Sequence, residues 1–417
     1  MSSSPEVKLR VLTLNCWGIR YMSKFCQERY EMIGDLLCEE KHDVVLLQEV
    51  WSEKDYLFLK NRISSSHPYS YYFKSGVIGS GLCIFSAHKI LDAFLFRYSL
   101  NGYPYKLQHG DWFGGKSVGL IILDINGLVV NAYVTHLHAE YCRENDSYLP
   151  HRLFQSWELA QFVRHTSKSA DVVILGGDLN MHPSDLGCRL LCSYTGLKDA
   201  FCEAESFEGC EGGSTLIPEN CFTSKEELCQ FPQGIRIDYI LYKGSASCSV
   251  KCKHLQSTKG SVPGKTFPYS DHEVVTAALC VQQKERNTRT ESNHSEDVNL
   301  ELVNILNECR TEIKVGVHSA EQMRYSTGRM GILGLVLMFL ELVIALVPFV
   351  IMETEHTFPR LSFQLLAVLA FTVLLVTGVL YVFHAIEVKV LQGTEDQMRL
   401  RVQALQEQVN QCQDSTL

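Results

Sequence analysis

The chain has 417 residues, of which 46% are hydrophobic and 20% are charged, and this composition excludes a disordered tail or a fibrous protein. Its net charge of −9 is unevenly spread, because residues 1–290 carry 30 basic and 32 acidic side chains whereas residues 291–417 carry 8 and 15. Nucleic-acid binders present a surplus of Lys and Arg to phosphate, so the near-neutral first part argues against DNA or RNA as a partner.

Short apolar segments rich in β-branched residues recur from residue 7 to about residue 282 and predict strands. We expect them at residues 10–14, 44–48, 81–85, 119–124, 128–135, 172–176, 238–241 and 274–281. Helical spacing of apolar residues at 29–39 and 151–167 separates some of these strands. Residues 1–282 are therefore predicted to form one compact α/β domain.

The 16 cysteines are scattered and form no Cys-x-x-Cys pair, which favours reduced and mostly buried thiols. Residues 1–10 are polar and no apolar stretch follows them, so we expect no secretory signal. Both observations predict a reducing, cytosolic compartment for this part of the chain.

The C-terminal third has a different pattern. Residues 283–297 contain no apolar side chain and are predicted to be a solvated linker, followed by an amphipathic juxtamembrane helix at 298–329. Residues 330–352 and 361–384 are each apolar and long enough to cross a hydrocarbon core about 30 Å thick. Because only residues 353–360 join them, we expect a transmembrane hairpin with both chain ends on one side of the membrane.

Charges outside the predicted spans indicate which side that is. Lys and Arg stand at positions 324, 329, 389, 399 and 401, whereas the connecting residues carry one Arg and two Glu. The positive-inside rule therefore places the N-terminal part and the C-terminus in the cytosol. The tail, residues 385–417, has apolar residues seven apart, but Gly393 interrupts the pattern. We expect an amphipathic helix there, with a weak homodimer through that helix as the alternative.

Polar clusters stand at the ends of six predicted strands, at residues 14–17, 47–51, 135–140, 176–180, 236–239 and 270–273. A sheet places strand ends side by side, so these groups are expected to converge at one edge of the sheet. The chemistry that they would support is phosphodiester hydrolysis. Mg²⁺ takes oxygen ligands, and Glu49 and Asn15 fit that role.

The remaining groups fit acid–base work. His272 is the natural general base for an attacking water, and Asp238 fits the carboxylate that orients its imidazole. Asp178 and Asn180 alternate on one face, so both can point at the phosphate and the water. His136 can donate to a non-bridging oxygen as charge builds there, whereas His138 is expected to be only a neighbour of the site.

This set resembles the superfamily of deoxyribonuclease I, the base-excision endonucleases and the inositol polyphosphate 5-phosphatases, over roughly residues 8–282. The matching positions, in order, are Asn15, Glu49, Asp178, Asn180, Asp238, Asp271 and His272. The resemblance implies a four-layer α/β sandwich of two packed mixed β-sheets with helices outside. It makes Glu49 the chief metal ligand, and Asp271 a ligand of a second metal or a partner of His272.

Within that superfamily the chain is most similar to the Mg²⁺-dependent neutral sphingomyelinases. The similarity is carried by residues 14–18, 48–51, 79–86, 135–141 and 177–183, and residues 111–116 resemble that family's Asp/Lys loop. It implies Mg²⁺, with Mn²⁺ as an alternative, and substrate binding by Lys116 and Asn180. It also implies hydrolysis of sphingomyelin to ceramide and phosphocholine at an internal membrane such as the endoplasmic reticulum.

Three other readings stay open at this point. A lyso-phospholipid with a choline headgroup, such as lyso-platelet-activating factor, would use the same residues. A nuclease or inositol phosphatase predicts a basic groove that the charge count does not indicate. A membrane scaffold without activity predicts that one of the six clusters has been lost, and all six are present.

Overall fold

The computed structural model describes residues 6–225, 228–284, 294–351 and 360–415. It divides into two compact units, one of residues 1–309 with 402–417 and one of residues 310–401. The first unit contains all the described strands and the predicted site.

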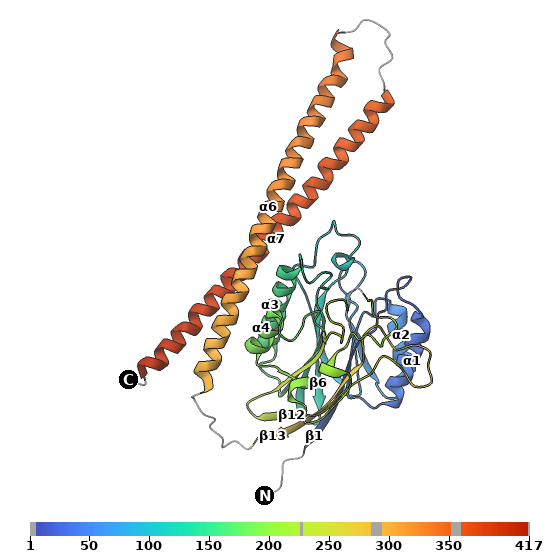
Figure 1. Ribbon diagram of the computed structural model, residues 1–417, viewed down its shortest axis with the longest axis vertical. Helices are drawn as coiled ribbons and strands as arrows, with labels where there is room; N and C mark the ends of the chain where they lie inside the picture. Colours follow the sequence, from blue (N-terminus) through green and yellow to red (C-terminus); the bar gives the residue numbers. More distant parts are fainter. Residues whose placement is uncertain (1–5, 226–227, 285–293, 352–359, 416–417) are drawn as a thin grey trace. The chain divides into compact units, whose positions relative to one another are not determined.

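Two mixed β-sheets form the centre of the first unit (Figure 1). The seven-stranded sheet has the order β10-β12-β13-β1-β2-β4-β3, with β1 and β2 parallel and β13 antiparallel to β1. Its strands are β1 (Val7–Asn15), β2 (Val44–Gln48), β3 (Tyr69–Tyr72), β4 (Cys83–Ser86), β10 (Phe207–Glu208), β12 (Cys248–Ser257) and β13 (Val275–Gln283).

The six-stranded sheet has the order β5-β6-β7-β8-β11-β9, with β7 and β8 parallel and β11 antiparallel to β8. Its strands are β5 (Ile90–Arg97), β6 (Ser117–Ile125), β7 (Leu128–His136), β8 (Val172–Asp178), β9 (Lys198–Asp199) and β11 (Asp238–Gly244). All eight predicted strands are thus present, with ends that differ by up to three residues.

Side chains that alternate between the two faces of a strand explain how the first sheet packs against the second sheet and against the helices. In β1, Leu9 and Val11 face the other sheet and join the core between the sheets, whereas Leu12 and Leu14 face outward. The outward residues pack under α1 (Cys26–Glu39) and α2 (Glu53–Arg62), because successive side chains of a strand point to opposite faces. Both faces of β1 are therefore buried.

Helices α3 (Leu149–Thr166) and α4 (Leu186–Thr195) lie on the outer side of the second sheet (Figure 1). Trp157 of α3 and Tyr194 of α4 pack with ring centroids 4.8 Å apart. Short helical turns complete the unit: η1 (Asp111–Phe113), α5 (Ala200–Glu203) and η2 (Glu211–Gly213). The predicted four-layer sandwich is confirmed.

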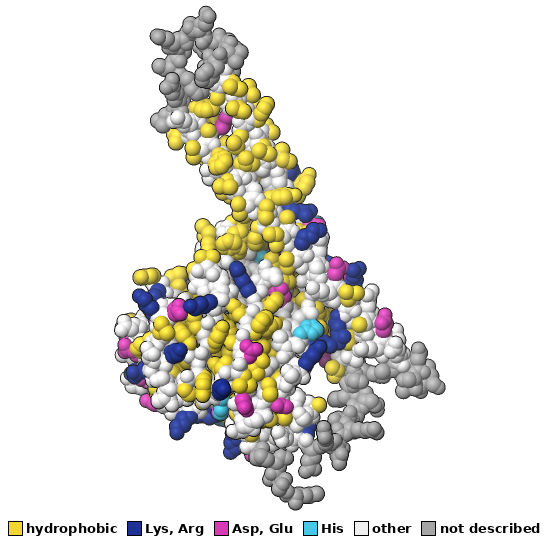
Figure 2. Space-filling model, turned by 180° about the vertical axis from the view of Figure 1, so that it is seen from behind, with side chains coloured by type: hydrophobic (Ala, Val, Ile, Leu, Met, Phe, Trp, Pro, Cys, Tyr) yellow, Lys and Arg dark blue, Asp and Glu magenta, His cyan; other side chains and the backbone are white. Residues whose placement is uncertain are grey.

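The two long helices are α6 (His294–Ile351) and α7 (Arg360–Ser415). Both are long and apolar enough to cross a membrane, and hydrophobic side chains cover the far part of the hairpin (Figure 2). Arg310 and Glu395 form an ion pair of 2.7 Å between them. The second unit is thus a helical hairpin, as the hydropathy pattern predicts.

Several predicted boundaries differ from the structure. Gln283 belongs to β13 and residues 294–297 belong to α6, so both ends of the predicted linker are regular structure, and residues 285–293 lie outside the described residues. Residues 352–359, in the predicted turn, also lie outside them. Helix α7 continues through Gly393, the position at which the spacing of apolar residues seven apart is interrupted. The described cysteines are free thiols, but five of them are exposed rather than buried: Cys38, Cys142, Cys202, Cys221 and Cys229.

Candidate active site

The predicted polar side chains meet at one edge of both sheets. Parallel strands end there and their antiparallel neighbours begin there, since Asp238 of β11 lies opposite Asp178 of β8. The positions are Asn15 at the end of β1, Glu49 just after β2, His136 at the end of β7, Asp178 at the end of β8, Asp238 at the start of β11 and His272 ahead of β13. The topology thus brings together residues more than 250 positions apart in the sequence.

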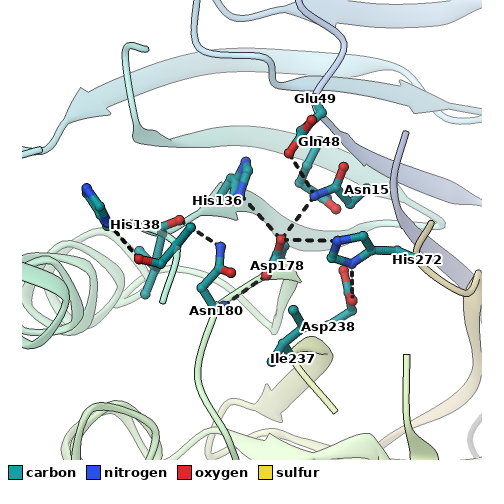
Figure 3. Close-up of polar contacts among 12 residues, drawn as sticks. Asn15, Gln48, Glu49, His136, His138, Asp178, Asn180, Ile237, Asp238 and His272 are labelled. Carbon is teal, nitrogen blue, oxygen red and sulfur yellow. Dashed lines mark hydrogen bonds and ion pairs between the residues drawn. The ribbon is translucent and has the colours of Figure 1, made fainter. Parts of the chain in front are cut away.

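Asp178 is the centre of the cluster (Figure 3). Its Oδ2 accepts a hydrogen bond of 3.0 Å from Asn15 Nδ2 and lies 3.3 Å from His136 Nε2 and 4.0 Å from His272 Nε2. Burial and the nearby charge of Asp238 raise the pKa of Asp178 above its usual range. Burial also lowers the pKa of His136, which is therefore neutral and can donate one ring hydrogen.

His272 and Asp238 form a buried pair. His272 Nδ1 and Asp238 Oδ2 are 2.8 Å apart, which leaves the other ring nitrogen of His272 on the side of Asp178. Burial opposes the imidazolium, but the negative charges of Asp238, Asp271 and Asp178 outweigh it and raise the pKa of His272. This is the geometry of a histidine that a carboxylate orients for proton transfer.

Glu49 has the properties of a cation ligand. Its half-buried carboxylate receives weak hydrogen bonds from Asn15 Nδ2 at 3.2 Å and from Trp51 Nε1 at 3.4 Å. Burial and repulsion by Asp271 raise the pKa of Glu49. Two carboxylates in one dry site fit a divalent cation, which would offset their repulsion.

Asn15 differs in detail from the prediction. Its Oδ1 accepts a hydrogen bond of 3.0 Å from the Trp17 amide, and its Nδ2 faces the carboxylates of Glu49 and Asp178. In this arrangement Asn15 positions the two carboxylates, and its role as a direct metal ligand stays a prediction. Among the described residues, the compact group that could hold a metal is instead Asp178, Asp238 and His272, with ligand atoms within 4.8 Å of one another.

The Asp/Lys loop lies beside this cluster. Lys116 is 2% exposed, and its Nζ lies 3.1 Å from Asp111 Oδ1 and 2.9 Å from the Leu137 carbonyl oxygen. Burial alone would raise the pKa of Asp111, but the charge of Lys116 and the hydrogen bond from Tyr141 hold it well below its usual range. His138 Nδ1 lies 3.7 Å from Asp111 Oδ2, so this histidine is a neighbour of the site. The binding of phosphate by Lys116 stays a prediction.

Asn180 lies next to this loop, and its Nδ2 donates to the Leu137 carbonyl oxygen at 3.0 Å. A cavity of about 880 Å³ opens over the cluster. The predicted residues that line it are Asn15, Glu49, Lys116, His136, Asp178, Asn180, Asp271 and His272, and Asp238 is reached only through His272.

Trp51 and Tyr141 also line the cavity, and they were missed as site residues. Trp51 ends the string 48–51, which is one of those that carry the family resemblance. Tyr141 ends the string 135–141, and that position was the one signal available for it.

Comparisons with known proteins agree with this geometry. The Endonuclease/Exonuclease/phosphatase family matches residues 12–272. Sphingomyelin phosphodiesterase 2 of Rattus norvegicus is 50% identical over 345 residues, which cover 83% of this chain and 82% of that protein. The Mus musculus protein of the same name is 46% identical over 393 residues, with coverages of 94% and 92%. The inositol phosphosphingolipids phospholipase C of Schizosaccharomyces pombe is 32% identical over 301 residues, with coverages of 68% and 70%.

Two solved structures share the fold. Sphingomyelinase C from Streptomyces griseocarneus has a TM-score of 0.53 at 19% identity, and covers 65% of this chain and 99% of its own. The beta toxin of Staphylococcus aureus has a TM-score of 0.51 at 19% identity, with coverages of 64% and 99%. At these identities they support the four-layer architecture alone.

Proposed function

The chain belongs to the Endonuclease/Exonuclease/phosphatase family, and we propose that it is a membrane-anchored, Mg²⁺-dependent phospholipase C that hydrolyses sphingomyelin to ceramide and phosphocholine. With relatives named sphingomyelin phosphodiesterase 2, it is a phosphodiesterase. The observation that carries the proposal is the buried His272–Asp238 pair beside Asp178, at the floor of a cavity that also contains Glu49.

The chain's own residues account for the proton transfers. His272 Nε2 takes a proton from water while Asp238 holds Nδ1, and the water oxygen attacks phosphorus in line with the ceramide oxygen. A P–O bond to water forms and the P–O bond to ceramide breaks. The ceramide oxygen takes a proton from solvent water, and His272 returns the proton that it took to solvent. Asp178 and Asn180 orient the water and the phosphate, and neutral His136 donates to a non-bridging oxygen.

Glu49 would hold the cation, with Asp271 on the same wall of the cavity. When bound there, Mg²⁺ supplies a Lewis acid for the phosphoryl oxygen and the leaving oxygen. A beta toxin variant of the same fold has been solved with bound magnesium ions, which makes Mg²⁺ the ion to test first and Mn²⁺ the second.

The hairpin of α6 and α7 would anchor the enzyme to the membrane that contains its substrate. The basic residues outside residues 330–352 and 361–384 favour a cytosolic catalytic unit and C-terminus. An internal membrane such as the endoplasmic reticulum is the location that we propose.

The test uses the full-length protein in detergent micelles. Sphingomyelin, lyso-platelet-activating factor, an inositol phosphosphingolipid and a DNA duplex would be offered in parallel, with Mg²⁺ or with EDTA. We expect Mg²⁺-dependent release of phosphocholine from sphingomyelin, reduced at least 100-fold by His272→Ala. The matched control is His165→Ala, at an exposed position near the end of α3. Cleavage of DNA with neither choline lipid touched would refute the proposal.

A further inference from the structure

Large apolar side chains are exposed to solvent around the mouth of the catalytic cavity. They come from three loops, which follow β1, join β3 to β4 and join β5 to β6. We call them the apolar rim, and their exposed fractions are 102% for Tyr21, 75% for Met22, 82% for Val77, 52% for Ile78 and 66% for Leu107. Scattered apolar residues are normal on a surface, but a group of this size around one opening marks an interaction site.

The rim belongs to the opening of the cavity. Tyr21, Met22, Ile78 and Leu107 line the same cavity as the catalytic His272. A molecule that reaches His272 therefore passes between these side chains, and whatever surface they contact is the surface from which the substrate arrives.

The first loop is held in place rather than loose. Tyr21 has φ 72°, a left-handed conformation that a bulky residue adopts only when its surroundings impose it. The buried Arg29 donates to the carbonyl oxygens of Trp17 at 2.7 Å and Lys24 at 2.9 Å, on either side of the tip. Phe25 stacks on Phe267 with ring centroids 4.6 Å apart. The fixed conformation of this loop therefore holds Tyr21 and Met22 in exposed positions.

The second and third loops are tied to each other. The Gly115 amide donates to the Gly79 carbonyl oxygen at 2.8 Å, and a Cβ on Gly76 would lie 2.5 Å from the Gly115 nitrogen. This close approach fixes Val77 and Ile78 beside the loop that carries Leu107. The rim is therefore preformed on both sides of the mouth.

Two of the basic side chains near the rim are paired with carboxylates, Arg20 with Asp55 at 2.7 Å and Lys74 with Glu53 at 3.1 Å. Lys106 instead donates to Ser147 Oγ at 2.6 Å, and Lys24 is exposed, so two positive charges remain beside the apolar side chains. An apolar rim with so few free charges suits a surface that is apolar inside and close to neutral outside. A phosphocholine bilayer has that chemistry, whereas anionic lipids or an acidic protein would call for a larger cluster of unpaired Lys and Arg.

We propose that the apolar rim inserts into the boundary between headgroups and acyl chains of a zwitterionic bilayer and holds the cavity mouth at the level of the lipid phosphate. This rests on the proposed function, because it supplies the step that brings a membrane-embedded phosphodiester to His272 and leaves the acyl chains in the bilayer. A membrane anchor keeps the chain near the lipid, whereas the rim sets the depth and direction of the catalytic cavity.

The experiment compares two substrates with the full-length protein in phosphatidylcholine proteoliposomes. One is sphingomyelin in the bilayer and the other is water-soluble p-nitrophenylphosphocholine. For Tyr21→Ser/Met22→Ser and for Val77→Ser/Leu107→Ser we expect the ratio of the bilayer rate to the soluble rate to fall at least tenfold. The control is Leu91→Ser/Phe94→Ser, which alters two residues of β5 that are 52% and 57% exposed and do not line the cavity, and it should leave the ratio within twofold.

A direct measurement of depth accompanies the rates. An indole introduced by Met22→Trp should be quenched by phosphatidylcholine brominated near the start of its acyl chains, and one introduced by Leu91→Trp should not. An unchanged ratio in both rim variants, or an equal loss on both substrates, would overturn the proposal, as would the absence of quenching. Quenching with no sphingomyelin hydrolysis by the unaltered protein would support the rim and refute the proposed substrate.

Discussion

Replacing Arg29 by methionine removes a buried guanidinium that joins the segment directly after Asn15, at the end of β1, to the segment that leads to His272. Arg29 lies on α1 with no exposed surface. Its Nη1 donates to the carbonyl oxygens of Cys16 at 2.7 Å and Tyr269 at 3.1 Å. Cys16 directly follows Asn15, and Tyr269 precedes His272 by three residues, so one side chain sets the spacing of the cation site and the base.

The magnitude follows from the bonds lost. Arg29 makes four hydrogen bonds to backbone carbonyl oxygens, and methionine fills most of its volume but donates none. At about 1 kcal/mol for each bond, with a further penalty for buried carbonyls left unpaired, we expect the free energy of unfolding to fall by about 3–5 kcal/mol. A shift of the base by about 1 Å from the reacting phosphate should also lower kcat about 10–100-fold, with little change in KM.

The assay is chemical denaturation followed by steady-state kinetics at a temperature where each variant is folded. Arg29→Lys keeps the charge and part of the hydrogen bonding, so its stability and kcat should lie between those of the unaltered protein and those of Arg29→Met. Arg62→Met removes a half-exposed arginine that pairs with Asp35, and should change stability by less than about 0.5 kcal/mol. If folded Arg29→Met protein keeps full kcat, the guanidinium only stabilises the fold and the reasoning about loop spacing is refuted.

Three further predictions concern single residues. Glu49→Gln should weaken Mg²⁺ binding at least tenfold by titration calorimetry, and unchanged binding would place the cation elsewhere. Burial raises the pKa of Glu158 to about 7 from 4.5, so the folded protein binds the extra proton and stability should fall as pH rises from about 4.5 to about 7. Glu158→Gln should flatten that slope in thermal denaturation, and an unchanged slope would assign it to other groups. Gly177 has φ +150° and an added Cβ would lie 2.0 Å from the Thr135 carbonyl oxygen, so Gly177→Ala should lower the free energy of unfolding by more than about 3 kcal/mol. A loss below about 1 kcal/mol would contradict the steric argument.

Eight strands could be predicted because their signal is local, whereas β5 and β12 were not predicted. Segments such as β2 (Val44–Gln48) are short, β-branched and buried on both faces. Helix α2 was missed because it buries only Tyr56 and Leu59, too few apolar residues to show a helical period. Helix α7 continues through Gly393 because buried Leu391 and Met398 hold the helix together on either side of a glycine that costs about 1 kcal/mol.

The members of the candidate site could be predicted from residue type and strand ends, but their contacts could not. The sequence indicates that Asn15 and Glu49 are polar groups at neighbouring strand ends. Whether the amide oxygen or nitrogen of Asn15 faces Glu49 depends on the Trp17 amide, which occupies the oxygen. The pairing of Asp111 with Lys116 and Tyr141 likewise depends on how two loops fold over each other, and no local pattern encodes it.

Backbone conformation explains why local rules stop at the strand ends. Trp17, Glu49 and Asn180 have φ values of 46°, 55° and 49°, and each lies one or two residues beyond the end of β1, β2 or β8. A left-handed conformation costs a residue with a side chain about 1–2 kcal/mol, and glycine would relieve it. Glycine at position 49 would also delete the carboxylate, so the strain has to be offset by neighbours: the Gly18 amide donates to the Glu49 carbonyl oxygen, and the Val50 amide donates to that of Gly81. The conformation of Glu49 is therefore set by bonds to the loop after β1 and to the turn before β4, which the residues around position 49 do not encode. We expect such strained residues, held by segments distant in the sequence, at positions where the reaction requires a particular side chain that the local backbone conformation disfavours.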